Sequence, residues 1–157
     1  MAEARETDTI QFVRIGDRNS SPLWRNGKVF IITRQSSLVS ELERTFAEQL
    51  TICGQSDTAE EAVAAVARLK PDVALADISS VQRSGVDLVT TLRAARPTMK
   101  LLVRSTASHA EYATEILKAG ADGYLLATET PEEITLALTD VLNGHLYVSP
   151  GVLESGI

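Results

Sequence analysis

Short apolar runs alternate along the chain with longer segments in which apolar residues recur at helical spacing. Five such runs lie at 28–32, 50–54, 72–76, 100–105 and 122–126. The segments between them are amphipathic, as in the stripe formed by Leu38, Leu42 and Phe46. Continuous apolar runs of this length are typical of strands buried on both faces, whereas the longer spacing is typical of helices. The pattern therefore predicts five strand–helix units.

The predicted helices carry recognisable start signals. Thr58 and Ser108 each precede a Glu by three positions, which is the spacing of a capping box. Thr130 is followed directly by Pro131, which predicts an N-cap residue and a proline in the first helical turn.

Strict alternation of strands and helices predicts an α/β fold, a doubly wound five-stranded parallel sheet with helices on both faces. In such folds the functional site lies at the carboxyl ends of the strands. The positions that fall there are Thr33–Gln35, Asp77–Ser79, Ser105–Thr106 and Ala127–Thr128.

Two charged residues stand out in these strands. Asp77 ends the run DVALAD, as expected of a strand that delivers a carboxylate to the rim of the sheet. Arg104 lies inside the apolar run KLLVRS. Its guanidinium could extend to solvent along an apolar stem, or it could contact a partner or an internal acid.

Composition narrows the class of protein. The chain of 157 residues is long enough for one domain, and its 44% apolar residues suffice for a core without disulfides. The net charge of −6 and the absence of adjacent Lys or Arg residues argue against binding to nucleic acid or to anionic membranes. No apolar stretch is long enough to span a membrane, and no hydrophobic signal region opens the chain. These features predict a cytoplasmic protein.

Residues that could support catalysis are sparse. Cys53 is the only cysteine and has apolar neighbours, so we interpret it as a small buried residue. His109 and His145 are isolated from each other and from any ligand pattern. Neither a dinucleotide-binding nor a phosphate-binding glycine loop is present. We therefore expect no enzyme activity, no catalytic residues and no cofactor.

The first 27 residues differ from the rest. They form either a mobile arm or an extra strand at TIQFVRI, and Trp24 could dock the arm. At the other end, 151–157 is predicted to be a tail.

Several motifs together carry a family resemblance. They are KVFII, KPDVALADI, a glycine eight residues after Asp77, AGADGYLL followed by TPEE, and the closing NGHLYVSP. With these motifs the chain resembles the receiver domain of two-component response regulators, the CheY-like fold, and is most similar to receivers of LuxR-type (NarL-like) transcription regulators. The resemblance covers about 28–150 and implies a role in signal transduction and transcription regulation.

In that family an aspartate at the end of the third strand accepts a phosphoryl group. The resemblance places the acceptor at Asp77, the hydroxyl that ends the fourth strand at Ser105, and an aromatic that changes rotamer on activation at Tyr124. The acid pair that holds Mg²⁺ is replaced by Thr33 and Arg34.

The lysine that ends the fifth strand is also replaced, by Ala127. Asp77 and Arg34 together carry no net charge, and a hard Mg²⁺ ion requires several oxygen ligands. Mg²⁺ binding should be lost or very weak, and phosphoryl transfer loses its main electrostatic stabilisation. The chain is therefore predicted to be an atypical receiver.

Two alternatives concern Arg34. Its guanidinium could pair with Asp77 and place a permanent cation where the metal and lysine normally act, or it could point to solvent beside an inert aspartate. Two functions are also open. The chain is either a phosphorylation-independent receiver that works by protein contacts or a receiver with a working phosphoacceptor at Asp77. A receiver-like domain that senses a small ligand is a third reading.

The expected partners are proteins, including a second copy of the chain. The family commonly pairs through the face at 108–143, and here Tyr112, Tyr124 and Leu136 are candidate members of that surface. Some relatives pair through the first and fifth helices instead. LuxR-type regulators carry a DNA-binding domain after the receiver, and the seven residues after Pro150 are too few for one. The chain is then either a fragment of a larger regulator or a stand-alone receiver that does not itself bind DNA.

Overall fold

A computed structural model describes residues 27–46, 49–81 and 84–154. The predicted arm at 1–27 lies outside the described residues except for Gly27, which opens the first strand, and Trp24 is therefore also outside them. The elements in chain order are β1 (Gly27–Ile32), α2 (Ser36–Thr45), β2 (Leu50–Ser56), α3 (Ala59–Leu69), β3 (Val73–Asp77), α4 (Gly85–Ala95), β4 (Lys100–Ser105), α5 (Ala110–Ala119), β5 (Gly123–Leu126), α6 (Pro131–Leu142), β6 (Tyr147–Val148) and α7 (Pro150–Glu154).

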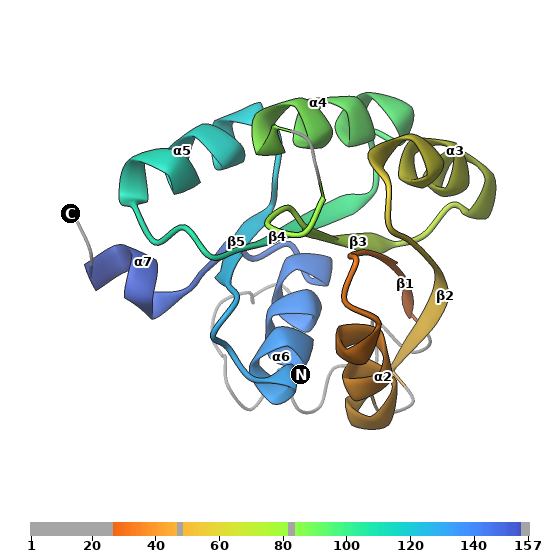
Figure 1. Cartoon of the computed structure of the whole chain (residues 1–157), viewed down its shortest axis with the longest axis horizontal. Coiled ribbons are helices and arrows are strands. Elements are labelled where there is room, and N and C mark those ends of the chain that lie inside the picture. The colour runs from red at the N-terminus through yellow and green to blue at the C-terminus, as the bar shows by residue number, and fades with distance from the viewer. Residues whose placement is uncertain (1–26, 47–48, 82–83, 155–157) are drawn as a thin grey trace, which may run out of the picture.

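The strands form one parallel sheet in the order β2-β1-β3-β4-β5-β6. The helices α3, α4 and α5 cover one face, and α2 and α6 cover the other (Figure 1). The doubly wound α/β prediction is confirmed, but the prediction of five strands is wrong. The sixth strand, β6, has only two residues, which is too short to produce an apolar run in the sequence.

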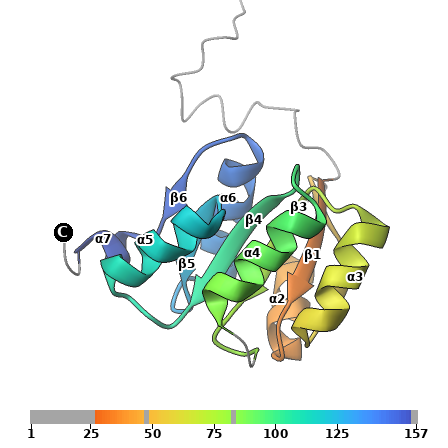
Figure 2. The same ribbon diagram turned by 90° about the horizontal axis from the view of Figure 1, so that it is seen from above.

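Both faces of the sheet are buried, and neighbouring residues of each strand face different helices. In β1, Phe30 and Ile32 belong to the cluster under α3, α4 and α5, whereas Val29 and Ile31 belong to the cluster over α2 and α6. Figure 2 shows the three helices of this layer, α3, α4 and α5, lying side by side over the sheet. This double burial explains why the strands are continuous apolar runs rather than alternating ones.

The helix start predicted at Thr130 is confirmed, with a reciprocal capping box between Thr130 and Glu133. At Thr58 the N-cap is confirmed, because its hydroxyl accepts a hydrogen bond from the Glu61 backbone N–H (3.2 Å), which is one of the two hydrogen bonds of a capping box. The N-cap predicted at Ser108 is one residue too early, because α5 begins at Ala110 with His109 at the N-cap position, and the His109 side chain makes no cap hydrogen bond.

The motif AGADGYLL joins the end of α5 to β5. Asp122 accepts hydrogen bonds from the Leu101 backbone N–H (2.9 Å) and from Arg93 Nη2 (2.8 Å). The Arg93 guanidinium also donates to the Gly120 carbonyl oxygen (2.6 Å). Gly120 has a φ of 128°, which favours glycine because it lacks a Cβ. The motif therefore fixes the start of β5 against α4 and β4.

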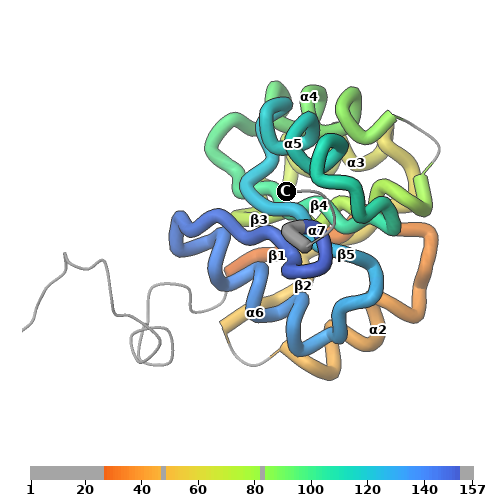
Figure 3. Tube along the Cα trace, turned by 90° about the vertical axis from the view of Figure 1, so that its left-hand side faces the viewer, coloured from red at the N-terminus to blue at the C-terminus, as the bar shows by residue number. Residues whose placement is uncertain are grey.

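The short strand β6 is secured by side chains as well as by its pairing with β5. Ser149 is buried, and its hydroxyl accepts a hydrogen bond from the Leu126 backbone N–H (2.8 Å). Val152 of α7 is buried in the core, so α7 extends the packed structure into the predicted tail. Figure 3 shows α7 close to β5, the neighbour of the edge strand β6. Among the described residues no helix is long and apolar enough to cross a membrane.

The hydroxyl of Tyr147 provides a test of this arrangement. It donates a 2.6 Å hydrogen bond to Glu129 Oε1, and burial together with this carboxylate raises the pKa of Tyr147 far above its ordinary value of 10.0. The folded state therefore holds the proton more tightly than the unfolded state does. The protonated Tyr147 hydroxyl therefore contributes to the free energy of unfolding below about pH 10, and this contribution declines as the pH rises further.

We predict that Tyr147→Phe lowers the free energy of unfolding by about 1 kcal/mol at neutral pH, because one hydrogen bond is lost. The variant should also lose less stability than the wild type between pH 7 and about pH 10.5. Urea denaturation at both pH values measures the two effects. Equal pH dependence of wild type and variant would contradict the assignment.

Candidate functional site

The site lies where β1, β3 and β4 end at the carboxyl edge of the sheet. Along each strand, every second residue faces α2 and α6, and Leu75 and Leu102 occupy two such positions. Two residues further on, Asp77 and Arg104 continue the same rows, and the two are direct partners in the β3–β4 register. Thr33, which comes just after the end of β1, likewise lies two residues beyond Ile31. The alternation of the strands therefore brings Thr33, Asp77 and Arg104 to one face.

Asp77 is fully buried, and its carboxylate is held from two sides. Oδ2 accepts a hydrogen bond from the Thr33 hydroxyl (2.7 Å) and lies 3.1 Å from Arg104 Nη1. Oδ1 has no hydrogen-bond partner among the described residues. The buried negative charge is thus matched by one buried positive charge, as the cost of burying an isolated ion requires.

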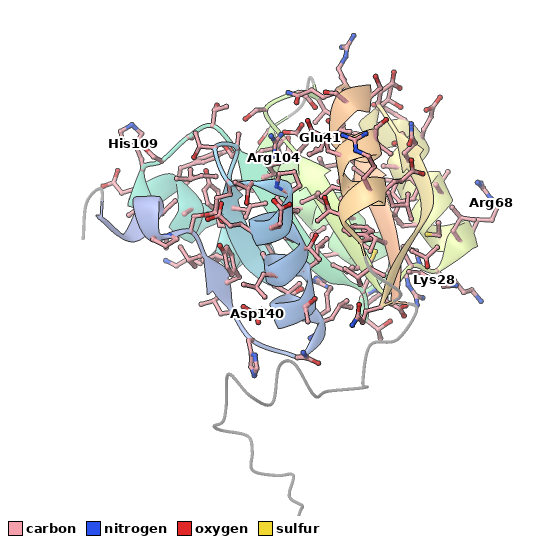
Figure 4. All side chains as sticks on the ribbon, turned by 90° about the horizontal axis from the view of Figure 1, so that it is seen from below. Lys28, Glu41, Arg68, Arg104, His109 and Asp140 are labelled. Atoms are coloured by element: carbon pink, nitrogen blue, oxygen red, sulfur yellow. The ribbon has the colours of Figure 1, made fainter. Side chains whose placement is uncertain are left out.

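Arg104 reaches Asp77 from the neighbouring strand, and only 10% of its side chain is exposed. Its Nη2 donates a hydrogen bond to the Ala127 carbonyl oxygen (3.1 Å). Figure 4 looks onto this side of the sheet and labels Arg104 between α2 and α6. Of the two readings of this arginine, the structure supports the contact with an internal acid.

Of the two alternatives for Arg34, the pairing with Asp77 is wrong and the structure supports the one in which Arg34 points to solvent. Arg34 is exposed, and its backbone N–H donates a hydrogen bond to the Ser80 hydroxyl (3.0 Å). The physical reason is the alternation of side chains along an extended chain. Thr33 points toward Asp77, so the next residue points away from it. The cation on Asp77 comes instead from Arg104.

Hydroxyl groups connect the loops above Asp77. The Ser80 hydroxyl donates to the Asp77 carbonyl oxygen (3.1 Å) and lies 3.4 Å from the Thr33 hydroxyl. On the other side, the Ser79 hydroxyl accepts a hydrogen bond from the Thr106 backbone N–H (2.8 Å). These contacts join the loops that follow β1, β3 and β4, and the acid carboxylate lies beneath them without exposure to solvent.

Ser105 and Tyr124, to which the resemblance assigns the hydroxyl that ends the fourth strand and the aromatic, lie near each other. Ser105 accepts a hydrogen bond from the Ala107 backbone N–H (3.0 Å), and Tyr124 donates from its hydroxyl to the Ala107 carbonyl oxygen (2.6 Å). Burial raises the pKa of Tyr124, and the Ser105 hydroxyl partly opposes this. Since the Tyr124 ring is fully buried in the cluster under α3, α4 and α5, its prediction as part of an interaction surface does not hold.

Of the remaining surface candidates, Leu136 is 43% exposed on α6. Tyr112 is half-buried, and its ring meets that of Tyr124 edge to face with centroids 6.3 Å apart. A Cβ added to Gly85 would lie 2.5 Å from the Tyr112 hydroxyl. The glycine eight residues after Asp77 therefore gives room for Tyr112 against α4.

The residues around Asp77 do not fit a magnesium ion. Mg²⁺ prefers an octahedron of oxygen ligands that includes carboxylates. Here there is one carboxylate, one of its oxygens is engaged by a guanidinium, and the Thr33 hydroxyl donates toward it. Across the described part of the chain, no group of three or more His, Cys, Asp or Glu residues could hold a metal ion.

The geometry agrees with comparison to known families. A family model described as the response regulator receiver domain matches residues 29–139. The chain belongs to this family. The matched segment runs from β1 into α6, so it contains every strand end that builds the site.

Curated relatives are regulators of LuxR/NarL type. The chain is 28% identical over 129 residues to the response regulator GacA of Pseudomonas aeruginosa, covering 81% of this chain and 60% of GacA. It is 30% identical over 105 residues to the nitrate/nitrite response regulator NarL of Escherichia coli, covering 67% of this chain and 49% of NarL. The chain thus spans about half the length of the curated relatives it matches.

Solved structures share the fold. A LuxR-family response regulator from Aurantimonas sp. SI85-9A1 superposes with a TM-score of 0.74 at 17% identity, covering 82% of this chain and 94% of that one. The isolated receiver domain of RcsB from Salmonella enterica serovar Typhimurium, in the presence of a phosphomimetic, gives 0.73 at 16% identity, covering 82% and 96%. The CheY-like receiver fold inferred from the motifs is confirmed.

The buried ion pair predicts a specific pattern of stability. Asp77→Asn leaves Arg104 buried without its counterion, and Arg104→Met leaves Asp77 in the same state. Each single change should lower the free energy of unfolding by about 3–5 kcal/mol. The double variant should lose clearly less than the sum, because it removes both charges. Urea denaturation of the four proteins measures this coupling.

Arg34→Met is the matched control, since it removes an arginine from the same edge of the sheet. We expect a change within about 0.5 kcal/mol, as for an exposed substitution. If the losses of unfolding free energy in the double variant were additive, or if Arg34→Met lost much stability, Arg104 would not be the counterion of Asp77.

Proposed function

We propose that this chain is an atypical receiver that works in signal transduction and transcription regulation through protein contacts, without conventional Mg²⁺-dependent phosphorylation of Asp77. The observation that carries the proposal is the 3.1 Å ion pair between Arg104 and Asp77 inside the protein. In a conventional receiver a metal ion and a lysine balance the charge of the acceptor aspartate. Here Arg104 already balances the charge of Asp77.

The electrostatics of the pocket support this reading. Asp77 contributes one negative charge and Arg104 one positive charge, so the pair is neutral before any ligand arrives. A transferring phosphoryl group requires cations placed on its oxygens. Arg104 is committed to Asp77 Oδ2 and the Ala127 carbonyl, and position 127 supplies no ammonium group. Loss of one such stabilising group commonly lowers a rate by about 10²–10³.

Access to Asp77 supports it as well. An attacking carboxylate must approach within contact distance of the phosphorus of a donor. Asp77 has no solvent exposure, and the hydroxyls of Ser79 and Ser80 connect the loops above it. Phosphorylation would require these hydrogen bonds to open and the ion pair to separate in the same event.

We propose protein partners rather than nucleic acid for this chain, in keeping with its net charge of −6. The face at 108–143 is the candidate surface, with Leu136 and Tyr112 as its accessible members, and a homodimer through this face is one form of the contact. The proposed domain spans 28–150. Because the matched part of the chain covers only 49% of NarL, control of a DNA-binding domain in a longer regulator fits this role. A cytoplasmic location belongs to the same proposal.

One observation favours a working phosphoacceptor as the second candidate. Asp77 Oδ1 has no hydrogen-bond partner among the described residues, so one oxygen of the acceptor position is uncommitted. In this reading Arg104 would release Oδ2 and turn its guanidinium toward the phosphoryl oxygens, which arginine binds well.

Phosphotransfer separates the two candidates. The 157-residue chain is incubated with acetyl phosphate and Mg²⁺, and the intact mass is measured alongside Asp77→Asn and a receiver that retains the acid pair and the lysine. We expect no gain of a phosphoryl group in the wild-type chain under conditions in which the reference receiver is labelled. Mg²⁺-dependent labelling of the wild type that is absent in Asp77→Asn would overturn the proposed function.

A further inference from the structure

Arg104 touches two elements that are not neighbours in the sheet. Its guanidinium lies 3.1 Å from the carboxylate that ends β3 and donates a 3.1 Å hydrogen bond to the Ala127 carbonyl, immediately after β5. The arginine belongs to β4, which lies between those two strands. One side chain therefore crosses the carboxyl edge of the sheet and connects both flanking strand ends.

The loop on the β5 side is short and held at several points. The Ala127 N–H donates to the Ser105 carbonyl oxygen (2.8 Å), and the Glu129 N–H donates to the Leu126 carbonyl oxygen (3.1 Å). The Glu129 carboxylate accepts the Tyr147 hydroxyl from β6 (2.6 Å). Thr130 then caps α6. Arg104 supplies the contact that ties this loop, 127–130, to the buried acid.

We infer that Arg104 is a built-in latch that joins the buried Asp77 to the loop 127–130 and holds the start of α6 in one arrangement without a bound metal or phosphoryl group. The inference rests on the proposed function, whose partner-facing surface at 108–143 contains this loop. In this chain the residue at the acceptor position acts as a counterion that positions Arg104, and Arg104 positions the loop.

The guanidinium is suited to this double contact. It is planar and extended, so Nη2 can donate a hydrogen bond to the Ala127 carbonyl while Nη1 lies 3.1 Å from Asp77 Oδ2 as an ion pair. A lysine ammonium would keep the charge but concentrate it at one point. Arg104→Lys therefore keeps a positive charge beside Asp77 but removes the simultaneous contact with the Ala127 carbonyl. It separates the effect of the charge from the effect of the double contact.

Amide hydrogen exchange of the full 157-residue chain, measured without kinase, metal or phosphodonor, tests the latch. In Arg104→Met we expect the amides of Ala127 and Glu129 to exchange about tenfold faster, relative to the central β1 amides of Val29–Ile31, as for the loss of one charge-assisted hydrogen bond. Asp77→Asn should speed exchange of the same amides in the same direction, because Arg104 loses its anchor.

Arg104→Lys should retain protection of the Ser80 amide, which donates to the Asp77 carbonyl (3.2 Å), while Ala127 and Glu129 lose theirs. This variant decides the matter if Arg104→Met does not fold. Arg34→Met is the control and should leave the exchange of all these amides unchanged.

Three results would overturn the latch: unchanged loop exchange in the Arg104 variants, a uniform increase that includes β1, or a loop that responds to Arg104→Met but not to Asp77→Asn. The exchange measurement is independent of the phosphotransfer assay. Phosphorylation of the wild-type chain by acetyl phosphate would contradict the proposed function. The latch is contradicted only by the hydrogen-exchange results given above.

Discussion

A carboxylate buried at the end of a central strand requires a counterion, and this requirement organises the carboxyl edge of the sheet. Asp77 has no exposure to solvent, and an uncompensated charge in that position would cost several kcal/mol. The counterion is Arg104 on the adjacent strand, 3.1 Å away. Arg104 also donates a hydrogen bond to the Ala127 carbonyl oxygen. The residue that neutralises the buried charge therefore also contacts the loop before α6.

Receiver chemistry depends on groups that leave the acceptor aspartate charged, accessible and surrounded by cations that can be shared with a phosphoryl group. In this chain the aspartate is buried and lies 3.1 Å from the Arg104 guanidinium, which is the basis of the proposal of an atypical receiver. The Thr33 hydroxyl donates to Asp77 where an acid would bind metal, and Ser80 joins the loops that cover it. The family fold is thus compatible with a site in which the acid serves structure rather than transfer.

Much of the fold could be predicted because parallel strands buried on both faces leave continuous apolar runs, and helices such as α6 start with Thr130 and Pro131. The two-residue strand β6 could not, because it forms only by pairing with β5 and through the Ser149 hydroxyl. At the site, the sequence left Arg34 either paired with Asp77 or pointing to solvent, and it offered an internal acid as only one alternative for Arg104. The missed signal was the alternation itself, which places Asp77 and Arg104 two residues beyond Leu75 and Leu102 on the same face of neighbouring strands.

The sequence by itself determined the alternating α/β architecture, the family motifs and the place of Asp77 at a strand end, and it predicted that Thr33, Arg34 and Ala127 replace the acid pair and the lysine of the family. These are properties of local pattern and of residue identity. The tertiary structure alone decided which arginine meets Asp77, that Tyr124 is buried, and that hydroxyls close over the acid. Such contacts depend on which strands become neighbours and which way each side chain points, and both are settled only when the sheet assembles.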